Sequence, residues 1–214
     1  MEEKQQRHFV LVHGACLGAW CWYKLQPLLE AAGHRVTVFD LSASGIDPKS
    51  LNELRTFTDY TLPLFKVMDS ISPDEKVVLV GHSLGGMNLA FAMEKYPLKI
   101  SAAVFVTAYM PDTVHRPSYV LEQTPPQDSL DTQFIQFGRP EDKLTAMFFG
   151  PKYISRMYRL CSPEDVALAK TLVRPMSIFL EDLSKRSPFS NEGFGSVKRA
   201  YIICAKDEGI IEEF

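Results

Sequence analysis

The segment VVLVGHSLGGMNLA, residues 77–90, places one serine between two glycines. Apolar β-forming residues precede Gly-His-Ser-Leu-Gly, and a helical pattern follows it. A strand that enters a helix through Gly-x-Ser-x-Gly is typical of a nucleophile elbow, where a strained turn holds the serine hydroxyl above the sheet. The pattern predicts Ser83 as the nucleophile of an acyl transfer. A phosphate-binding turn is the rival interpretation, but these glycines match neither common phosphate motif.

Attack on an ester carbonyl places negative charge on its oxygen, and fixed hydrogen-bond donors must stabilise that charge. One donor is commonly the backbone N–H after the nucleophile, and the other lies in the loop after the first strand. These positions predict the N–H groups of Leu84 and Ala15 as the oxyanion donors. We expect His13 to brace this loop rather than act as a base. His82, directly before the nucleophile, is expected to line the pocket or pack beneath it.

A catalytic triad in this chain order needs an acid and then a histidine after the serine. Asp207 follows the last β-rich run, residues 197–204, and is the predicted acid, with Glu208 as the fallback. All five histidines precede residue 116, so none follows Asp207. His8, His34 and His115 lie at strand starts or in loops and are expected to be exposed, which leaves the triad base without a candidate in the required place.

Short apolar runs alternate with helical patterns around these residues. Expected strands cover residues 9–12, 35–39, 77–80, 100–106 and 197–204, and expected helices cover 22–32, 52–70 and 83–96. Nearly continuous apolar strands separated by helices predict an α/β fold with a mostly parallel sheet and helices on both faces.

The alternation stops between residues 111 and 191. This stretch is rich in proline turns and aromatic residues, and Ser162-Pro163-Glu164-Asp165 predicts a helix start. We interpret it as an inserted helical cap subdomain within one structural domain. Residues 1–110 form the first part of the core, and residues 192–214 resume it.

Composition excludes several classes of function. The 214 residues carry a net charge of -3 and have no basic stripe, so we expect no nucleic-acid partner. No window approaches the roughly 18 apolar residues of a membrane span, and no secretory leader precedes the first strand, so we expect a cytoplasmic protein without a membrane partner. The four scattered cysteines suit reduced thiols, and no ligand cluster predicts a metal or other cofactor.

Several segments closely resemble the plant methylesterases, which are a group of α/β-hydrolases. This group includes a salicylic-acid-binding protein, methyl jasmonate esterases and polyneuridine aldehyde esterase. The segments that carry the resemblance are HFVLVHGACLGAWCWYKLQPLLEAAGH, VLVGHSLGGMNLA, AAVFVTAYMPD, MFFGP, LCSPED, LVRP and GSVKRAYIICAKDEGIIEEF. The resemblance spans essentially the whole chain. It implies the α/β-hydrolase fold, a small-molecule ester or aromatic acid as the partner, and a possible homodimer.

Carried over residue by residue, the resemblance implies Ser83 as nucleophile, Asp207 as the triad acid, and Ala15 and Leu84 as oxyanion donors. It also implies a pocket for a small planar acyl group. The residues expected to shape that pocket are Gly14, His82, Phe134, Met147 and Phe149.

Family members continue past the position of Phe214 with a last strand, a loop bearing the catalytic histidine, and a final helix. We therefore expect that last strand and helix to be absent here, in an incomplete copy or a natural short form. The first hypothesis is a serine carboxylesterase for methyl esters such as methyl salicylate and methyl jasmonate, and the second is a non-catalytic binder of salicylate or another small acid. A hydroxynitrile lyase is the third hypothesis, since the lyases also resemble this chain. It ranks below the esterase because the lyases carry threonine where this sequence has Gly14, and their elbow is Gly-Glu-Ser-Cys-Gly where this one is Gly-His-Ser-Leu-Gly.

Overall fold

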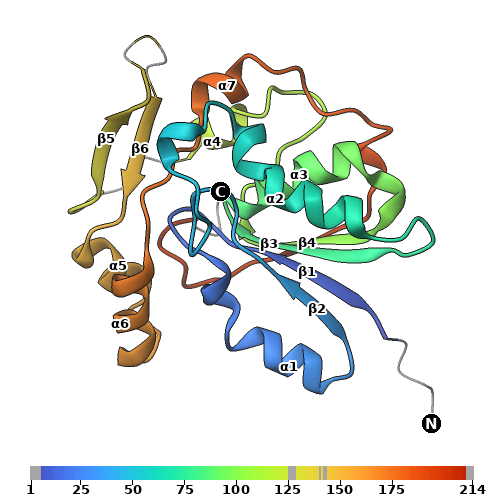
Figure 1. Cartoon of the computed structure of the whole chain (residues 1–214), viewed down its shortest axis with the longest axis horizontal. Coiled ribbons are helices and arrows are strands. Elements are labelled where there is room, and N and C mark those ends of the chain that lie inside the picture. The colour runs from blue at the N-terminus through green and yellow to red at the C-terminus, as the bar shows by residue number, and fades with distance from the viewer. Residues whose placement is uncertain (1–5, 125–128, 140, 142–143, 211–214) are drawn as a thin grey trace.

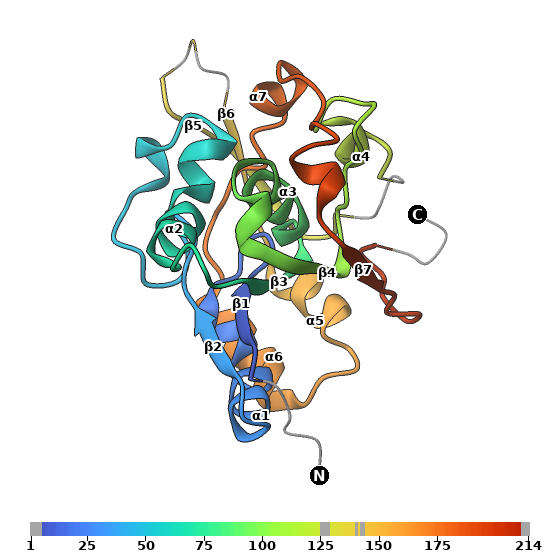
Figure 2. The ribbon, with the colours of Figure 1, turned by 90° about the vertical axis from the view of Figure 1, so that its right-hand side faces the viewer.

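The computed structural model describes residues 6–124, 129–139, 141 and 144–210. Five strands form its central sheet in the order β2-β1-β3-β4-β7, and every neighbouring pair is parallel. The strands are β1 (His8–Val12), β2 (Arg35–Val38), β3 (Val77–Ser83), β4 (Ile100–Ala108) and β7 (Arg199–Ile202). Figure 2 shows β2 and β7 at opposite edges of the sheet.

Helices cover both faces of this sheet (Figure 1). The α-helices are α1 (Leu25–Ala31), α2 (Phe57–Ser70), α3 (Gly85–Lys95), α4 (Tyr119–Glu122), α5 (Pro151–Met157), α6 (Pro163–Leu172) and α7 (Leu180–Ser184). Short 3-10 turns are η1 (Ala19–Trp22), η2 (Leu51–Glu53), η3 (Pro97–Lys99) and η5 (Phe194–Ser196). α1 lies on one side of the sheet, and α2 and α3 lie on the other. The predicted parallel sheet with helices on both faces is confirmed.

Alternate residues of each strand feed two separate hydrophobic layers. Val10 and Leu79 belong to the large core beneath α2 and α3, whereas Leu11 and Val80 pack in the smaller layer that includes Leu25 of α1. Successive side chains of a strand point to opposite faces, so a strand covered on both sides must be apolar throughout. This packing explains the continuous apolar runs of the sequence.

The cap differs from the expected purely helical insertion. Residues 111–191 contain α4 to α7, but also an antiparallel pair of strands, β5 (Gln133–Phe137) and β6 (Leu144–Phe148). Apolar residues alternate with polar ones in parts of both strands, and a Gly138 turn follows β5 with φ of 76°. Period-2 alternation favours a strand, and here it was hidden among the aromatic residues of the cap.

The helix start predicted at Ser162 is confirmed. The Ser162 side chain accepts a hydrogen bond from the N–H of Asp165, and the Asp165 carboxylate accepts one from the N–H of Ser162. This reciprocal capping box satisfies two backbone donors at the start of α6. Asp165 also accepts hydrogen bonds from the Tyr23 hydroxyl and the Lys24 ammonium group, so the start of α6 is attached to the core.

Arg174, in the segment after α6, connects the cap to the core. Its backbone N–H donates to the carbonyl of Cys16 at 3.0 Å, and its guanidinium group donates to the carbonyls of Gly45 at 2.8 Å and Asp47 at 2.9 Å. The cap is thereby held directly over the loop that follows β1. Within the described ranges, no helix has the length and apolar character needed to cross a bilayer.

Candidate active site

The turn between β3 and α3 presents Ser83 in a strained conformation. Ser83 has φ of 53°, a left-handed value that costs a residue with a β-carbon of order 1–3 kcal/mol. At Gly85, an added Cβ would lie 2.7 Å from the Val12 carbonyl oxygen, so a side chain there would collide with the end of β1. The close approach of the start of α3 to the end of β1 therefore explains the second glycine of the motif.

The loop after β1 lies directly beside this elbow. A Cβ built on Gly14 would be 2.9 Å from the Ser83 Cβ and 3.1 Å from Nδ1 of His82. Cys16 follows with φ of 60° and a buried side chain. Gly14 is thus a point of backbone contact with the nucleophile rather than an open wall of the pocket.

The two predicted oxyanion donors both line a cavity with Ser83. Among the described residues, neither the N–H of Ala15 nor that of Leu84 donates a hydrogen bond to another group of the chain. Most buried backbone donors in folded proteins are satisfied, so two unsatisfied amides beside a raised serine are unusual. They are suited to an external oxygen that carries negative charge.

His13 braces the oxyanion loop, as the sequence predicts. Its Nε2 accepts a hydrogen bond from the N–H of Leu41 at 3.0 Å, and its Nδ1–H donates to the carbonyl of Gly14 at 2.9 Å. Burial lowers the pKa of His13 to about 4, so the ring is neutral near pH 7 and can fill both roles. The ring is occupied by structural bonds and lies outside the cavity lining.

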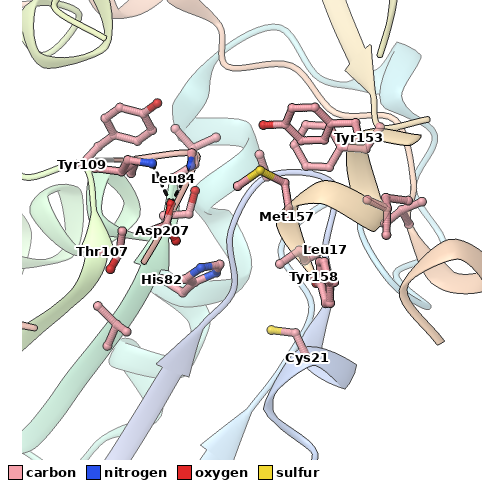
Figure 3. A pocket seen from close by; sticks show the side chains of 18 of the residues that line it. Leu17, Cys21, His82, Leu84, Thr107, Tyr109, Tyr153, Met157, Tyr158 and Asp207 are labelled. Atoms are coloured by element: carbon pink, nitrogen blue, oxygen red, sulfur yellow. Dashed lines mark hydrogen bonds between the residues drawn. The ribbon is translucent and has the colours of Figure 1, made fainter. Parts of the chain in front are cut away.

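Asp207 comes from the segment after β7. Its Oδ1 accepts hydrogen bonds from the N–H groups of Gly209 at 2.7 Å and Ile210 at 2.8 Å, which Figure 3 marks by dashed lines. At its own N–H, Asp207 donates to the carbonyl of Cys204 at 2.8 Å. These bonds fold the chain into a tight turn and fix the carboxylate at the cavity.

Glu208, the fallback acid, faces a different environment. Its carboxylate accepts hydrogen bonds from Nε of Arg156 at 2.7 Å and from Nε of Arg159, both in or just after α5. These arginines lower the pKa of Glu208 below its ordinary value. Glu208 is not among the residues that line the cavity, and it attaches the Asp207 turn to the cap.

A cavity of about 580 Å³ joins the core elbow to the cap. It is lined by seven of the predicted site residues, Ala15, His82, Ser83, Leu84, Met147, Phe149 and Asp207. Figure 3 shows the two walls: Leu84, Asp207, Thr107 and His82 lie on one side, and Tyr153, Met157, Tyr158, Leu17 and Cys21 lie on the other. Elements from both ends of the chain thus meet at one space.

Like Gly14, the predicted pocket residue Phe134 is not part of the cavity lining. It lies on β5 with 62% of its surface exposed, and it does not line the cavity. Its partner across the hairpin, Met147, does line the cavity. The prediction for Phe134 is therefore wrong in this structure. The cause is the unrecognised hairpin, because the sequence pattern was interpreted as a helical cap that contained both residues.

Of the five histidines, all within described parts of the chain, His82 is the one that lines the cavity. Burial lowers its pKa below the ordinary value, while the charge of Asp207 acts in the opposite direction. The indole ring of Trp22 meets its imidazole edge-on, with ring centroids 6.5 Å apart.

The expectation of an exposed His8 is wrong, because His8 is 7% exposed and forms hydrogen bonds with Glu75 and Thr37 at the opposite end of the sheet.

Several residues of the cap wall were not predicted from the sequence. Tyr153, Met157 and Tyr158 line the cavity, but in the sequence they were three members of a longer aromatic and methionine-rich stretch. The helix start at Pro151 supplied a usable signal. One turn of helix separates Tyr153 from Met157, so both side chains lie on one face of α5.

The described portion of the chain contains no candidate metal site, that is, no group of three or more histidine, cysteine, aspartate or glutamate residues that could hold a metal ion. The cavity's chemistry is carried by a hydroxyl, backbone amides, a carboxylate and an imidazole. Most of the other side chains that line it are apolar or aromatic. This combination is typical of a site that binds an apolar organic molecule and transfers an acyl group.

Comparisons with known proteins agree with this geometry. Residues 7–189 match the family described as the alpha/beta hydrolase fold. The chain is 64% identical to salicylic acid-binding protein 2 of Nicotiana tabacum over 99% of its own length and 83% of that relative's, and 54% identical to methylesterase 1 of Arabidopsis thaliana over 99% and 82%. The crystal structure of polyneuridine aldehyde esterase, at 56% identity, superposes with a TM-score of 0.96 over 98% of this chain and 84% of that one. The chain belongs to the plant methylesterase family of the α/β-hydrolase superfamily and is, by family, a carboxylic ester hydrolase.

Proposed function

We propose that this chain hydrolyses methyl esters of small carboxylic acids, of the methyl salicylate or methyl jasmonate type, with Ser83 as the nucleophile. The observation that carries the proposal is that the strained Ser83, with φ of 53°, lines one cavity together with Ala15 and Leu84, whose N–H groups have no acceptor among the described residues. Names of relatives add support, since one is called a salicylic acid-binding protein and another a methylesterase.

The proposed reaction has two steps. The Ser83 Oγ attacks the ester carbonyl, its proton passes to a base, and the N–H groups of Ala15 and Leu84 stabilise the oxyanion. The base then protonates the leaving methoxide, so methanol departs and an acyl-serine remains. Water attacks this acyl group through the same oxyanion geometry and releases the free acid.

In the plant methylesterases that this chain resembles, the base is a histidine that the triad acid orients. We assign Asp207 to the role of that acid. His82 also lines the cavity, but burial lowers its pKa and so opposes its acceptance of a proton. Without a base, the serine remains a weak nucleophile, and the loss of a triad histidine alone costs about as much as the loss of all three members.

Hydrolysis is tested by incubating the 214-residue chain with methyl salicylate and methyl jasmonate and measuring the acid released. We expect Ser83→Ala to lower the rate by about 10⁴-fold or more while the fold is retained. Ser70→Ala is the matched control, because Ser70 is an exposed serine at the end of α2, and it should leave the rate unchanged. An unchanged rate in Ser83→Ala would remove Ser83 from the proposal.

A second candidate function is non-catalytic binding of the free acid. The observation behind it is that the largely apolar cavity and the two unsatisfied amides can hold a carboxylate without any base. The carboxylate of salicylate would then occupy the position of the oxyanion, between the N–H groups of Ala15 and Leu84. Salicylate binding by calorimetry, without release of acid from either ester, would support this function over hydrolysis.

A further arm of the assay joins the chain to the terminal segment of the tobacco relative. Turnover by the joined protein alone would assign the base to that segment, and equal turnover by both proteins would assign it to the 214 residues.

We also propose a cytoplasmic location and a homodimer. Fractionation of tissue tests the location, and light scattering of the purified protein tests the dimer.

A further inference from the structure

Tyr153 places a phenol group on the cap side of the cavity, opposite the proposed nucleophile. It belongs to α5, and Figure 3 shows its hydroxyl pointing from the cap across the cavity toward the wall that carries Leu84 and Asp207. Ser83 lines the same cavity and directly precedes Leu84 in the chain. A small acyl group bound with its carbonyl at Ser83 would lie between this hydroxyl and the wall that carries Leu84, so an oxygen beside its carboxyl carbon can face the phenol.

The ring of Tyr153 is held in place by its surroundings. The Phe149 ring packs against it with centroids 4.6 Å apart and an interplanar angle of 30°. At the backbone, the N–H groups of Lys152 and Tyr153 donate to the carboxylate of Asp131, each at 2.9 Å. A Cβ built on Gly150 would lie 2.3 Å from Cγ of Asp131, so this carboxylate packs directly against the start of α5. A polar group held by such contacts can select a ligand because little motion is lost on binding.

The Tyr153 hydroxyl has no hydrogen-bond partner among the residues that the structure describes, and its side chain is half-buried in a largely apolar space. Tyr109, the other phenol near the elbow, differs in this respect because its hydroxyl accepts a hydrogen bond from Thr124 at 3.3 Å. Burial, with the nearby Tyr109, Cys16 and Asp207, raises the pKa of Tyr153 above its ordinary value. The phenol is therefore protonated near pH 7 and can donate a hydrogen bond.

We propose that Tyr153 is a specificity-determining residue that donates a hydrogen bond to an oxygen substituent beside the carboxyl carbon of the ligand. The favoured ligand class is thus esters and acids with a hydroxyl or keto oxygen ortho or alpha to the carboxyl group, over analogues that lack this oxygen. The inference rests on the proposed function for the position of the carbonyl, at Ser83 and the two oxyanion amides.

The physical reason for selection is the cost of an unpaired polar group. An analogue without the oxygen displaces water from the Tyr153 hydroxyl and gives it no acceptor in return. The apolar ring packs equally well against either ligand. Selection should therefore appear as a ratio of affinities rather than as a general loss of binding.

The test measures the dissociation constants of salicylate and benzoate by calorimetry, with the 214-residue chain and its Tyr153→Phe variant. Benzoate is the matched ligand because it differs from salicylate only in the missing ortho hydroxyl group. The native chain should bind salicylate about five- to tenfold more tightly than benzoate, and Tyr153→Phe should bring that ratio to within about twofold of one. Tyr119→Phe makes the same chemical change on the surface outside this cavity and should keep the native ratio.

An unchanged ratio in Tyr153→Phe overturns the inference. An equal weakening of both ligands also overturns it, because the phenol would then contact the carboxylate that the ligands share. These outcomes are independent of hydrolysis, since both ligands are free acids. If neither methyl ester is hydrolysed but the ratio falls as expected, the catalytic proposal fails and the specificity of Tyr153 stands.

Discussion

Gly14 and Ser83 lie so close that a side chain at position 14 would meet the nucleophile. A Cβ on Gly14 would be 2.9 Å from the Ser83 Cβ, shorter than ordinary contacts between such atoms. The same Cβ would also lie 3.1 Å from Nδ1 of His82 and 3.2 Å from the His82 carbonyl oxygen. The oxyanion loop and the elbow are therefore one packed unit.

Gly14→Ala is expected to lower ester hydrolysis by about 10²-fold, because a displaced loop moves the Ala15 N–H away from the oxyanion. Overpacking should cost about 1–3 kcal/mol of unfolding free energy. Acid release and urea denaturation measure the two effects. Gly33→Ala is a useful comparison, because an added Cβ there meets no neighbouring atom within 4 Å and any cost comes from its φ of 89°. Native hydrolysis by Gly14→Ala would contradict the assigned position of the donor.

Ser83→Gly should stabilise the protein while it removes hydrolysis. The positive φ of Ser83 costs about 1–3 kcal/mol, and glycine adopts this conformation freely. Glycine also increases the entropy of the unfolded chain, which offsets about 0.4–1 kcal/mol of that gain. The expected net result is an unfolding free energy higher by about 1 kcal/mol. Ser83→Ala keeps the strain, so a stability gain as large in Ser83→Ala would contradict the explanation.

The elbow and its partners could be predicted because their chemistry leaves a local trace in the sequence. Ser83 is marked by the flanking glycines, Leu84 by adjacency, and Ala15 by the end of the first strand. Phe134 and Tyr153 could not be separated in the same way. Each is an aromatic residue of the cap, and only the pairing of β5 with β6 and the start of α5 decide which one reaches the cavity.

The pH dependence of stability should carry the signature of His13. Its pKa is about 4 in the folded protein and about 6.5 in an unfolded chain, so the folded state binds fewer protons between these values. Stability is therefore fully present above about pH 6.5 and falls as the pH decreases toward 4. From pH 7 to pH 5, His13 should account for a loss of about 2 kcal/mol in unfolding free energy.

Urea denaturation at pH 7 and pH 5 measures this effect. His13→Gln keeps a donor and an acceptor for Gly14 and Leu41 but does not titrate, so its loss between the two pH values should be smaller by about 2 kcal/mol. His34→Gln provides the matched control at the far end of the sheet, beside Arg7. An identical pH dependence in native protein and His13→Gln would show that the ring is not buried as a neutral group.

Asp207 and Glu208 are adjacent carboxylates with different expected roles. Asp207→Asn retains an oxygen that accepts from the N–H groups of Gly209 and Ile210, so the turn should persist while the negative charge at the cavity is lost. We expect hydrolysis to fall by about 10³–10⁴-fold, because that charge orients the base and stabilises its protonated form. Glu208→Gln removes a charge that faces Arg156 and Arg159 outside the cavity, and it should change hydrolysis by less than about tenfold. Rates of acid release from methyl salicylate compare the two variants. Losses of equal size would mean that attachment of the turn to the cap, rather than the charge of Asp207, controls the reaction.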